Sequence, residues 1–224
     1  YPHDKDLKEI ELELNKLAHY LGVNLNDVKK YKNKCDKLRN YALEIDRLTW
    51  QENLITGFEN HYWLINTSDF MGDLNKFEQE IICFIKEAKK RQLIKSKYRL
   101  GYVGIPPIIS DFYEQIESLG ASIIFNEVQR QFAMPYKTKN IIEQYQKYTY
   151  PYSFGGRLQD IKEQIKLRKL DGLIHYVQSF CHLQINDILL RRHVDVPVLT
   201  IEADKPGPMS ARSKIKLEGF IEML

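Results

Sequence analysis

The residue of this chain best placed to do chemistry is Cys181, which ends the stretch Asp171-Gly-Leu-Ile-His-Tyr-Val-Gln-Ser-Phe-Cys181. Leu, Ile, Tyr and Val fill four of the six positions 173–178, a composition typical of a strand covered on both faces. From Leu183 to Leu190 the apolar residues recur at helical spacing instead. We therefore expect the thiol at the carboxyl end of a parallel strand and near a helix N-terminus. Ligands bind at that edge of open α/β sheets, and a helix N-terminus favours a thiolate.

The local sequence leaves three roles open for Cys181. An inert core thiol needs apolar surroundings, and a nucleophile needs a base, for which His175 and His182 are near in sequence. A soft-metal ligand needs further ligands, because one thiolate holds neither zinc nor an iron–sulfur cluster alone. A hydrogen-bonded structural role is expected for His175 within its strand, and His182 is expected to be partly exposed.

Polar residues near the ends of the other predicted strands form a second group of candidates. Glu202 and Asp204 end the last strand, where they could cap a turn or hydrogen-bond a ligand. Arg130 and Arg157 could each pair with an anionic ligand or be surface charges. The segment 101–107 lacks the third glycine of a dinucleotide fingerprint, and its prolines remove backbone donors, so dinucleotide binding is not expected. The candidate substrate-binding residues are Pro106, Arg130, Gln178, Ser179, Glu202 and Asp204.

The elements that position these residues fall into two regions. Residues 1–97 are predicted to be a helical connector, because their apolar residues recur at helical spacing. Residues 98–224 alternate strands with helices, which predicts right-handed crossovers and a parallel sheet. The expected fold class is α/β: a four-stranded parallel flavodoxin-like sheet of order 2-1-3-4, preceded by an α-helical region. That order places the loops 105–107 and 178–181 beside the ligand crevice.

The boundaries of these elements follow from the same patterns. The strands are predicted at residues 100–105, 121–125, 172–178 and 196–202. The segments 126–130 and 203–207 are expected to open on the same edge of the sheet as Cys181. Residues 136–170 are predicted to be mostly helical, with breaks at Tyr150-Pro151 and Gly155-Gly156. Asn24 and Ser210 are expected to cap the helices that follow them.

The charge and cysteine content exclude several classes of protein. The chain has 224 residues, and its 33 basic and 30 acidic residues give a formal net charge of +3, so neither nucleic acid nor membrane is expected as a partner. No apolar run approaches the ~18 residues of a membrane span. The wide spacing of Cys35, Cys83 and Cys181 does not predict a disulfide framework, and the reducing cytoplasm is the expected location. Because the sequence starts at Tyr1 and stops at Leu224 within a helical pattern, we expect it to be part of a longer protein.

Several segments together resemble a known family: 171–181, 197–204, 206–208 with 211–212, 101–107 and 125–135. They resemble the D-component family of 2-hydroxyacyl-CoA dehydratases, which includes 2-hydroxyglutaryl-CoA dehydratase. The segments 101–107 and 125–135 look closest to the double-cubane-cluster and dehydratase-like branch. The resemblance covers residues 98–224 well. The helical region resembles more loosely the connector between the two α/β domains of that family, so the chain looks like its C-terminal portion.

The resemblance implies an iron–sulfur enzyme. In that family, cysteines from several segments hold a cluster such as 4Fe-4S, and an ATP-dependent activator protein donates one electron. The cluster relays the electron to an acyl-CoA thioester, and the resulting radical loses water in an anaerobic lyase reaction. Cys181 matches the last cysteine metal ligand. Two departures are evident: Val128-Gln129-Arg130 stands where typical subunits carry a cysteine, and the N-terminal α/β domain with the first ligand cysteines is absent from this sequence.

The expected function is therefore that of a C-terminal fragment of a 2-hydroxyacyl-CoA dehydratase-like protein, which contributes Cys181 to a low-potential cluster. We expect the cluster in the full-length protein and not in this fragment, which alone would be inactive. The expected partners are the N-terminal α/β cluster domain, the ATP-dependent activator and, from the family pattern, a second subunit in a dimer. The alternative is a non-catalytic ligand-binding or interaction module that kept the fold and lost the cluster.

Overall fold

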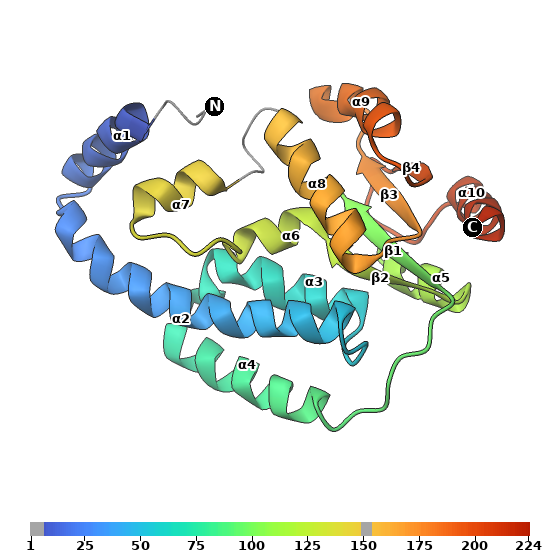
Figure 1. The fold of residues 1–224 in the computed structure, drawn as a ribbon, viewed down its shortest axis with the longest axis horizontal. Helices are drawn as coiled ribbons and strands as arrows, with labels where there is room; N and C mark the ends of the chain where they lie inside the picture. The colour runs from blue at the N-terminus through green and yellow to red at the C-terminus, as the bar shows by residue number, and fades with distance from the viewer. Residues whose placement is uncertain (1–6, 149–153) are drawn as a thin grey trace.

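A four-stranded parallel sheet organises the second half of the chain in the computed structural model, which describes residues 7–148 and 154–224 (Figure 1). The strands are β1 (Tyr98–Val103), β2 (Ala121–Asn126), β3 (Gly172–Val177) and β4 (Val198–Glu202). Their order is β2-β1-β3-β4, and every neighbouring pair is parallel. The predicted α/β class, strand order and direction are therefore confirmed. All four strands end at the same edge of the sheet.

Helices make up most of the remaining described residues. They are α1 (Leu7–Tyr20), α2 (Leu25–Trp50), α3 (Gly57–Ile65), η1 (Asn66–Ser68), η2 (Phe70–Gly72), α4 (Leu74–Ala88), α5 (Phe112–Ser118), α6 (Glu127–Phe132), α7 (Ile141–Lys147), α8 (Phe154–Arg168), η3 (His182–Ile185), α9 (Asn186–His193) and α10 (Ala211–Met223). The side chains of Asn24 and Ser210 cap α2 and α10, as predicted. Within the described ranges, every helix is too short or too polar to cross a membrane.

Both faces of the sheet are covered, which explains why its strands are rich in apolar residues. Because side chains alternate along a strand, Ile174 and Tyr176 of β3 face one side and Leu173 faces the other. The first side packs against α5 and α10 through a core that includes Phe112 and Phe220. The second packs against α8 and α9 through residues such as Ile161, Ile165 and Leu190. His175 and Val177 follow Leu173 at intervals of two and share its side.

The helices that precede β1 pack together and cover the edge strand β2. Their own core includes Leu38, Ile45 and Phe77. A Cβ atom at Gly57, the first residue of α3, would lie 2.6 Å from the carbonyl oxygen of Ile123 in β2, so only glycine permits this approach. A helix packed along an edge strand protects it from pairing with another strand.

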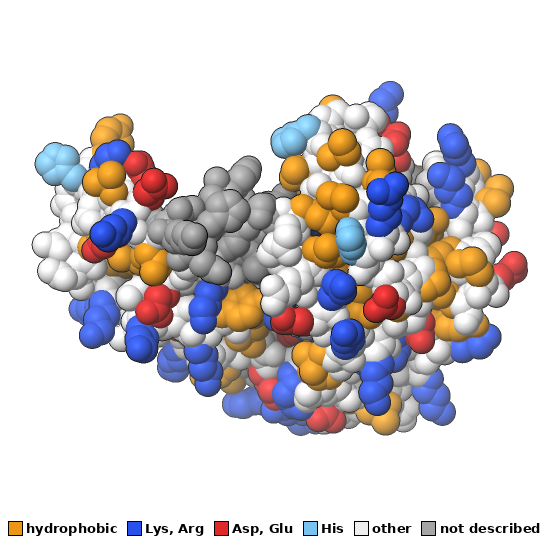
Figure 2. Space-filling model, turned by 45° about the horizontal axis from the view of Figure 1, so that its top comes forward, with side chains coloured by type: hydrophobic (Ala, Val, Ile, Leu, Met, Phe, Trp, Pro, Cys, Tyr) orange, Lys and Arg blue, Asp and Glu red, His pale blue; other side chains and the backbone are white. Residues whose placement is uncertain are grey.

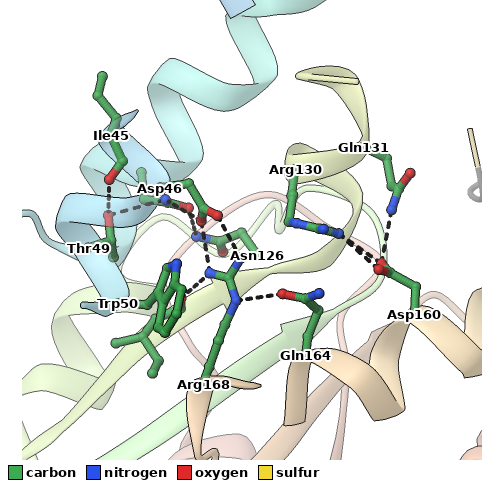
Figure 3. A network of polar contacts seen from close by, with 12 residues as sticks. Ile45, Asp46, Thr49, Trp50, Asn126, Arg130, Gln131, Asp160, Gln164 and Arg168 are labelled. Atoms are coloured by element: carbon green, nitrogen blue, oxygen red, sulfur yellow. Dashed lines mark hydrogen bonds and ion pairs between the residues drawn. The ribbon is translucent and has the colours of Figure 1, made fainter. Parts of the chain in front are cut away.

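Arg168 joins the helical region to the sheet (Figure 3). Its side chain is buried, and its guanidinium donates to both carboxylate oxygens of Asp46 on α2 at 2.9 and 2.6 Å and to the carbonyl oxygen of Ile124 in β2 at 2.9 Å. The guanidinium also lies over the rings of Trp50 and Phe125. Burial opposes ionisation of Asp46, but the charge and hydrogen bonds of Arg168 outweigh it and lower the pKa of this carboxyl. The sequence predicts a division of the chain between residues 97 and 98, which falls where β1 begins. The ion pair of Arg168 and Asp46 joins the two regions on either side of this division.

Two predicted details differ from the structure. Gly155-Gly156, predicted to break a helix, lies inside the first turn of α8, where a glycine costs little because the first amides of a helix need no internal partner. The segment 126–130, predicted to open on the carboxyl edge of the sheet, does follow β2 at that edge, but it forms α6 and is buried from Glu127 to Gln131. The break predicted at Tyr150-Pro151 lies outside the described residues.

Candidate functional site

A small pocket lies at the carboxyl ends of β1 and β3. Its wall includes Gly104 after β1, Arg157 from α8, His175 from β3, and Gln178 and Cys181 from the segment that follows β3. The cavity volume is about 40 Å³, enough for a few water molecules. Any larger group bound here must therefore project from its mouth. This is the edge at which open parallel sheets bind ligands.

Cys181 lies where the sequence predicts it, between the end of β3 and the start of a helix. The Cys181 amide donates to the carbonyl oxygen of Gln178 at 2.9 Å, and the Gln184 amide donates to the carbonyl oxygen of Cys181 at 3.0 Å. These bonds close a tight turn and begin η3, so the following helix is a short 3-10 helix that leads into α9. The Cys181 residue is half-buried, and its thiol forms no disulfide. The thiol is therefore held at the rim of the sheet and outside its packed interior.

His175 is oriented by a carboxylate behind it. Its Nδ1 lies 2.8 Å from Oδ1 of Asp187 on α9. Asp187 also accepts hydrogen bonds from the Thr200 hydroxyl at 2.6 Å and from Nε of Arg191 at 2.7 Å. Burial lowers the pKa of His175, although Asp187 opposes the shift. A neutral ring that donates from Nδ1 carries its lone pair on Nε2, so His175 offers an acceptor nitrogen in the pocket wall.

A buried ion pair holds Arg157, which lines the pocket, in place. Arg157 donates from Nε and Nη2 to Glu127 at 2.5 and 2.8 Å, and the amide of Gly104 donates to the same carboxylate at 3.1 Å. Gly104 has φ +119°, and a Cβ atom there would lie 2.6 Å from the carbonyl oxygen of Tyr176. Glycine is therefore required at this position. The contacts of Glu127 hold the ends of β1 and β2 and the start of α8 together.

Two predicted candidates, Ser179 and Asp204, bind each other at the rim of the sheet. The amide and hydroxyl of Ser179 donate to the two carboxylate oxygens of Asp204 at 2.8 and 2.6 Å. Both hydrogen bonds lower the pKa of Asp204, and the bond from the hydroxyl has the larger effect. This contact fixes the segment that carries Cys181 to the loop after β4.

The remaining candidates are spread over different surroundings. Gln178 lines the pocket, whereas Pro106 is half-buried in the loop after β1 and Glu202 is exposed at the end of β4. Arg130 is buried on α6, and its Nη1 donates to both carboxylate oxygens of Asp160 at 3.1 and 2.9 Å (Figure 3). The charge of Arg130 is thus committed to another side chain of the chain itself.

Apolar side chains are exposed beside Cys181. The apolar residues that recur at helical spacing after Cys181 do lie in helices. Among them, only Leu190 is buried. Phe180 is 76% exposed and Ile185 69% exposed, and Leu183, Ile188 and Leu189 are exposed as well. Figure 2 shows apolar side chains gathered on this face of the molecule. Exposed apolar side chains mark a contact with another surface or ligand when they form a large contiguous patch.

Sequence reasoning did not assign the two carboxylates that shape this site. Asp187 and Glu127 hold His175 and Arg157 in the pocket wall. The strand period of two does place His175 on the same face as Val177 near the carboxyl end of β3, which is a usable signal. The pairing of Glu127 with Arg157 joins residues thirty positions apart, and no local pattern indicates it.

The described residues do not form a complete iron–sulfur site. They contain no group of three or more His, Cys, Asp and Glu side chains that could hold a metal ion. Cys35 packs at the margin of the helical core, and Cys83 is exposed on α4 beside Glu87. At the pocket the described residues offer one sulfur, from Cys181, and one imidazole, from His175. An iron–sulfur cluster takes about four ligands.

A parallel sheet with helices on both faces, and a pocket beside a thiol at its carboxyl edge, define an α/β domain. The family model described as 2-hydroxyglutaryl-CoA dehydratase, D-component, matches residues 2–224. The chain therefore belongs to this family, and the match includes the helical region before β1. Among individually curated proteins, none is similar enough to be matched.

Proposed function

We propose that this chain is a component of a 2-hydroxyacyl-CoA dehydratase-like system in which Cys181 supplies one thiolate to an iron–sulfur cluster. Family membership supports the dehydratase-like assignment. The observation that carries the ligand role is the position of Cys181, half-buried at the carboxyl edge of the sheet and facing a pocket. A cluster bound to the whole protein would supply one-electron reduction of an acyl-CoA thioester, so that the substrate can lose water.

The other ligands must come from outside the described residues, since these offer a single thiol at the pocket. The exposed side chains of Phe180, Leu183 and Ile185 suit a contact with the N-terminal α/β domain that the family resemblance implies. Covering them would remove water from the surroundings of Cys181. A dry surrounding with few hydrogen bonds to sulfur is one of the means by which proteins set a low reduction potential.

Within the chain, the neighbouring residues would position the thiol and the substrate. The contact between Ser179 and Asp204 holds the turn that presents Cys181. Gln178 lines the pocket and offers an amide donor and acceptor to a thioester. Arg130 serves the fold through Asp160. Pro106 and Glu202 lie in the loop after β1 and at the end of β4, where a substrate that projects from the pocket would meet them. The ATP-dependent activator and a dimer partner belong to the same proposal.

The test is iron and acid-labile sulfide analysis of the whole protein purified without oxygen. Cys181→Ala is compared with Cys83→Ala, which removes an exposed thiol from α4. We expect the iron content to fall in Cys181→Ala and to stay unchanged in Cys83→Ala. Unchanged iron in Cys181→Ala would dismiss the ligand role.

The alternative is a non-catalytic binding module that kept the fold and lost the cluster. The feature that favours it is the absence, among the described residues, of a group of three or more metal-ligating side chains. The whole protein is purified without oxygen and then reconstituted anaerobically with ferrous iron and sulfide. Neither iron nor sulfide before or after this treatment would establish the alternative.

A further inference from the structure

His175 presents one ring nitrogen to the pocket that it shares with Cys181. Both residues line this pocket at the carboxyl ends of β1 and β3. Nδ1 of His175 is taken by Asp187, and Nε2 has no hydrogen-bond partner among the described residues. The residue is only 4% exposed, yet Nε2 is not one of the unpaired polar atoms that are sealed from solvent. The pocket is therefore the space into which Nε2 opens.

The network behind His175 decides which of its nitrogens is available. Oδ1 of Asp187 lies 2.8 Å from Nδ1 and also accepts from the Thr200 hydroxyl at 2.6 Å. Oδ2 of Asp187 accepts from Nε of Arg191 at 2.7 Å. Because a carboxylate only accepts, it keeps the ring proton on Nδ1 and leaves the lone pair on Nε2. Histidines that bind metals donate their other ring nitrogen to a carboxylate in the same way.

We propose that Nε2 of His175 is a second protein ligand of the iron–sulfur cluster, in addition to the thiolate of Cys181. This inference rests on the proposed function, because it requires a cluster at Cys181. Imidazole nitrogens replace cysteine sulfurs in one class of iron–sulfur cluster, so the exchange is chemically sound. Thiolates other than Cys181 must come from outside the described residues, whereas the chain itself supplies this nitrogen.

The size of the pocket fits a ligand that reaches one iron. A volume of about 40 Å³ excludes an acyl-CoA but leaves room for one corner of a cluster. The rest of the cluster would project from the mouth, where ligands from outside the chain can reach it. A neutral imidazole in place of a thiolate makes a cluster less negative. Its reduction potential is therefore higher than that of the same cluster held by cysteines alone.

The test is pulsed electron paramagnetic resonance of the whole protein, purified without oxygen, reconstituted with ferrous iron and sulfide, and reduced with titanium(III) citrate. Samples with natural histidine are compared with samples in which the histidine ring nitrogens are ¹⁵N, so that histidine couplings are recognised by their change. The variants are His175→Gln and, as the matched control, His182→Gln, which removes an exposed imidazole next to Cys181. We expect the coupling of a directly bound histidine nitrogen in the natural protein and in His182→Gln, and its loss in His175→Gln.

Two results would overturn this inference alone. The first is iron that depends on Cys181 without any coupling to a histidine nitrogen, which would leave the proposed function standing. The second is a coupling that persists in His175→Gln, because it would belong to another histidine. A whole protein without iron and sulfide would remove both the inference and the proposed function.

The fold of each variant is checked by far-ultraviolet circular dichroism. If His175→Gln does not fold, a crystal structure of the natural whole protein, grown without oxygen, decides the question. Iron within bonding distance of Nε2 would support the ligand role. A cluster bound to Cys181 with no iron at Nε2 would refute it.

Discussion

Ser179 donates both its amide and its hydroxyl to Asp204, and this contact ties the turn before Cys181 to the loop after β4. The first prediction concerns this contact. In Asp204→Ala, the turn should become mobile and the Cys181 thiol should react several-fold faster with iodoacetamide. The rate is measured by mass spectrometry, with the alkylation of Cys83 as the internal reference. An unchanged rate would show that the turn holds its shape without Asp204.

The second prediction concerns Gly104. In Gly104→Ala, the new Cβ atom would meet the carbonyl oxygen of Tyr176, and an alanine would have to adopt φ +119°. We expect the free energy of unfolding to fall by about 1–3 kcal/mol. Gly156→Ala is the matched control, because a Cβ atom at that helical position meets no other atom within 4 Å. It should be neutral or stabilise by about 0.5 kcal/mol in the same urea titration.

The third prediction concerns the buried ion pair of Arg168 and Asp46. Arg168→Gln leaves the Asp46 carboxylate buried without its cation, so we expect the free energy of unfolding to fall by about 3–5 kcal/mol. Lys16→Gln serves as control, because Lys16 and Glu13 form an exposed pair whose loss should cost less than about 1 kcal/mol. Equal effects of the two substitutions, measured by chemical denaturation, would contradict the importance of the buried pair.

The fourth prediction concerns the pH dependence of stability. His61 is stacked on Phe58, and burial lowers the pKa of His61 to about 4. Between that value and its ordinary pKa of 6.5, the unfolded chain binds a proton that the folded chain does not. The free energy of unfolding should therefore fall on acidification from pH 7 to pH 4, and His61 should contribute up to about 3 kcal/mol of this loss.

The measurement is urea denaturation at a series of pH values for the natural chain and for His61→Gln. The variant should lose less stability on acidification, while His193→Gln, an exposed control, should follow the natural chain. Burial lowers the pKa of His175 in the same direction. Because His175 is present in all three proteins, the difference between their curves isolates His61.

The sequence predicts the sheet well because the governing signals are local. Apolar strand composition, helical spacing between strands and the crossover rule predict four parallel strands and the place of Cys181 at the strand ends. The order β2-β1-β3-β4 was chosen as the flavodoxin-like arrangement of such strands, and the structure confirms it. The caps at Asn24 and Ser210 were predicted from one residue type at one position. Such signals need no knowledge of which distant residues meet.

The parts that were not predicted depend on contacts between distant residues. From the sequence, Arg130 could pair with an anionic ligand, whereas in the structure it pairs with Asp160. The network of Asp187, Thr200 and Arg191 behind His175 exists only because α9 packs beside β3 and β4. Likewise, α6 is buried against the helical region, so its short polar sequence does not show the helix. The ligand role of Cys181 stays a prediction.

The Arg168–Asp46 contact also constrains the order of events during protein synthesis. The two residues are 122 positions apart, so Asp46 leaves the ribosome long before its partner exists. Until α8 has been made, the packed arrangement of α2 would bury a carboxylate with no counter-charge, which is strongly unfavourable. We therefore expect α2 to reach its final packing against the sheet only after α8 has been made, whereas the earlier helices can form before it.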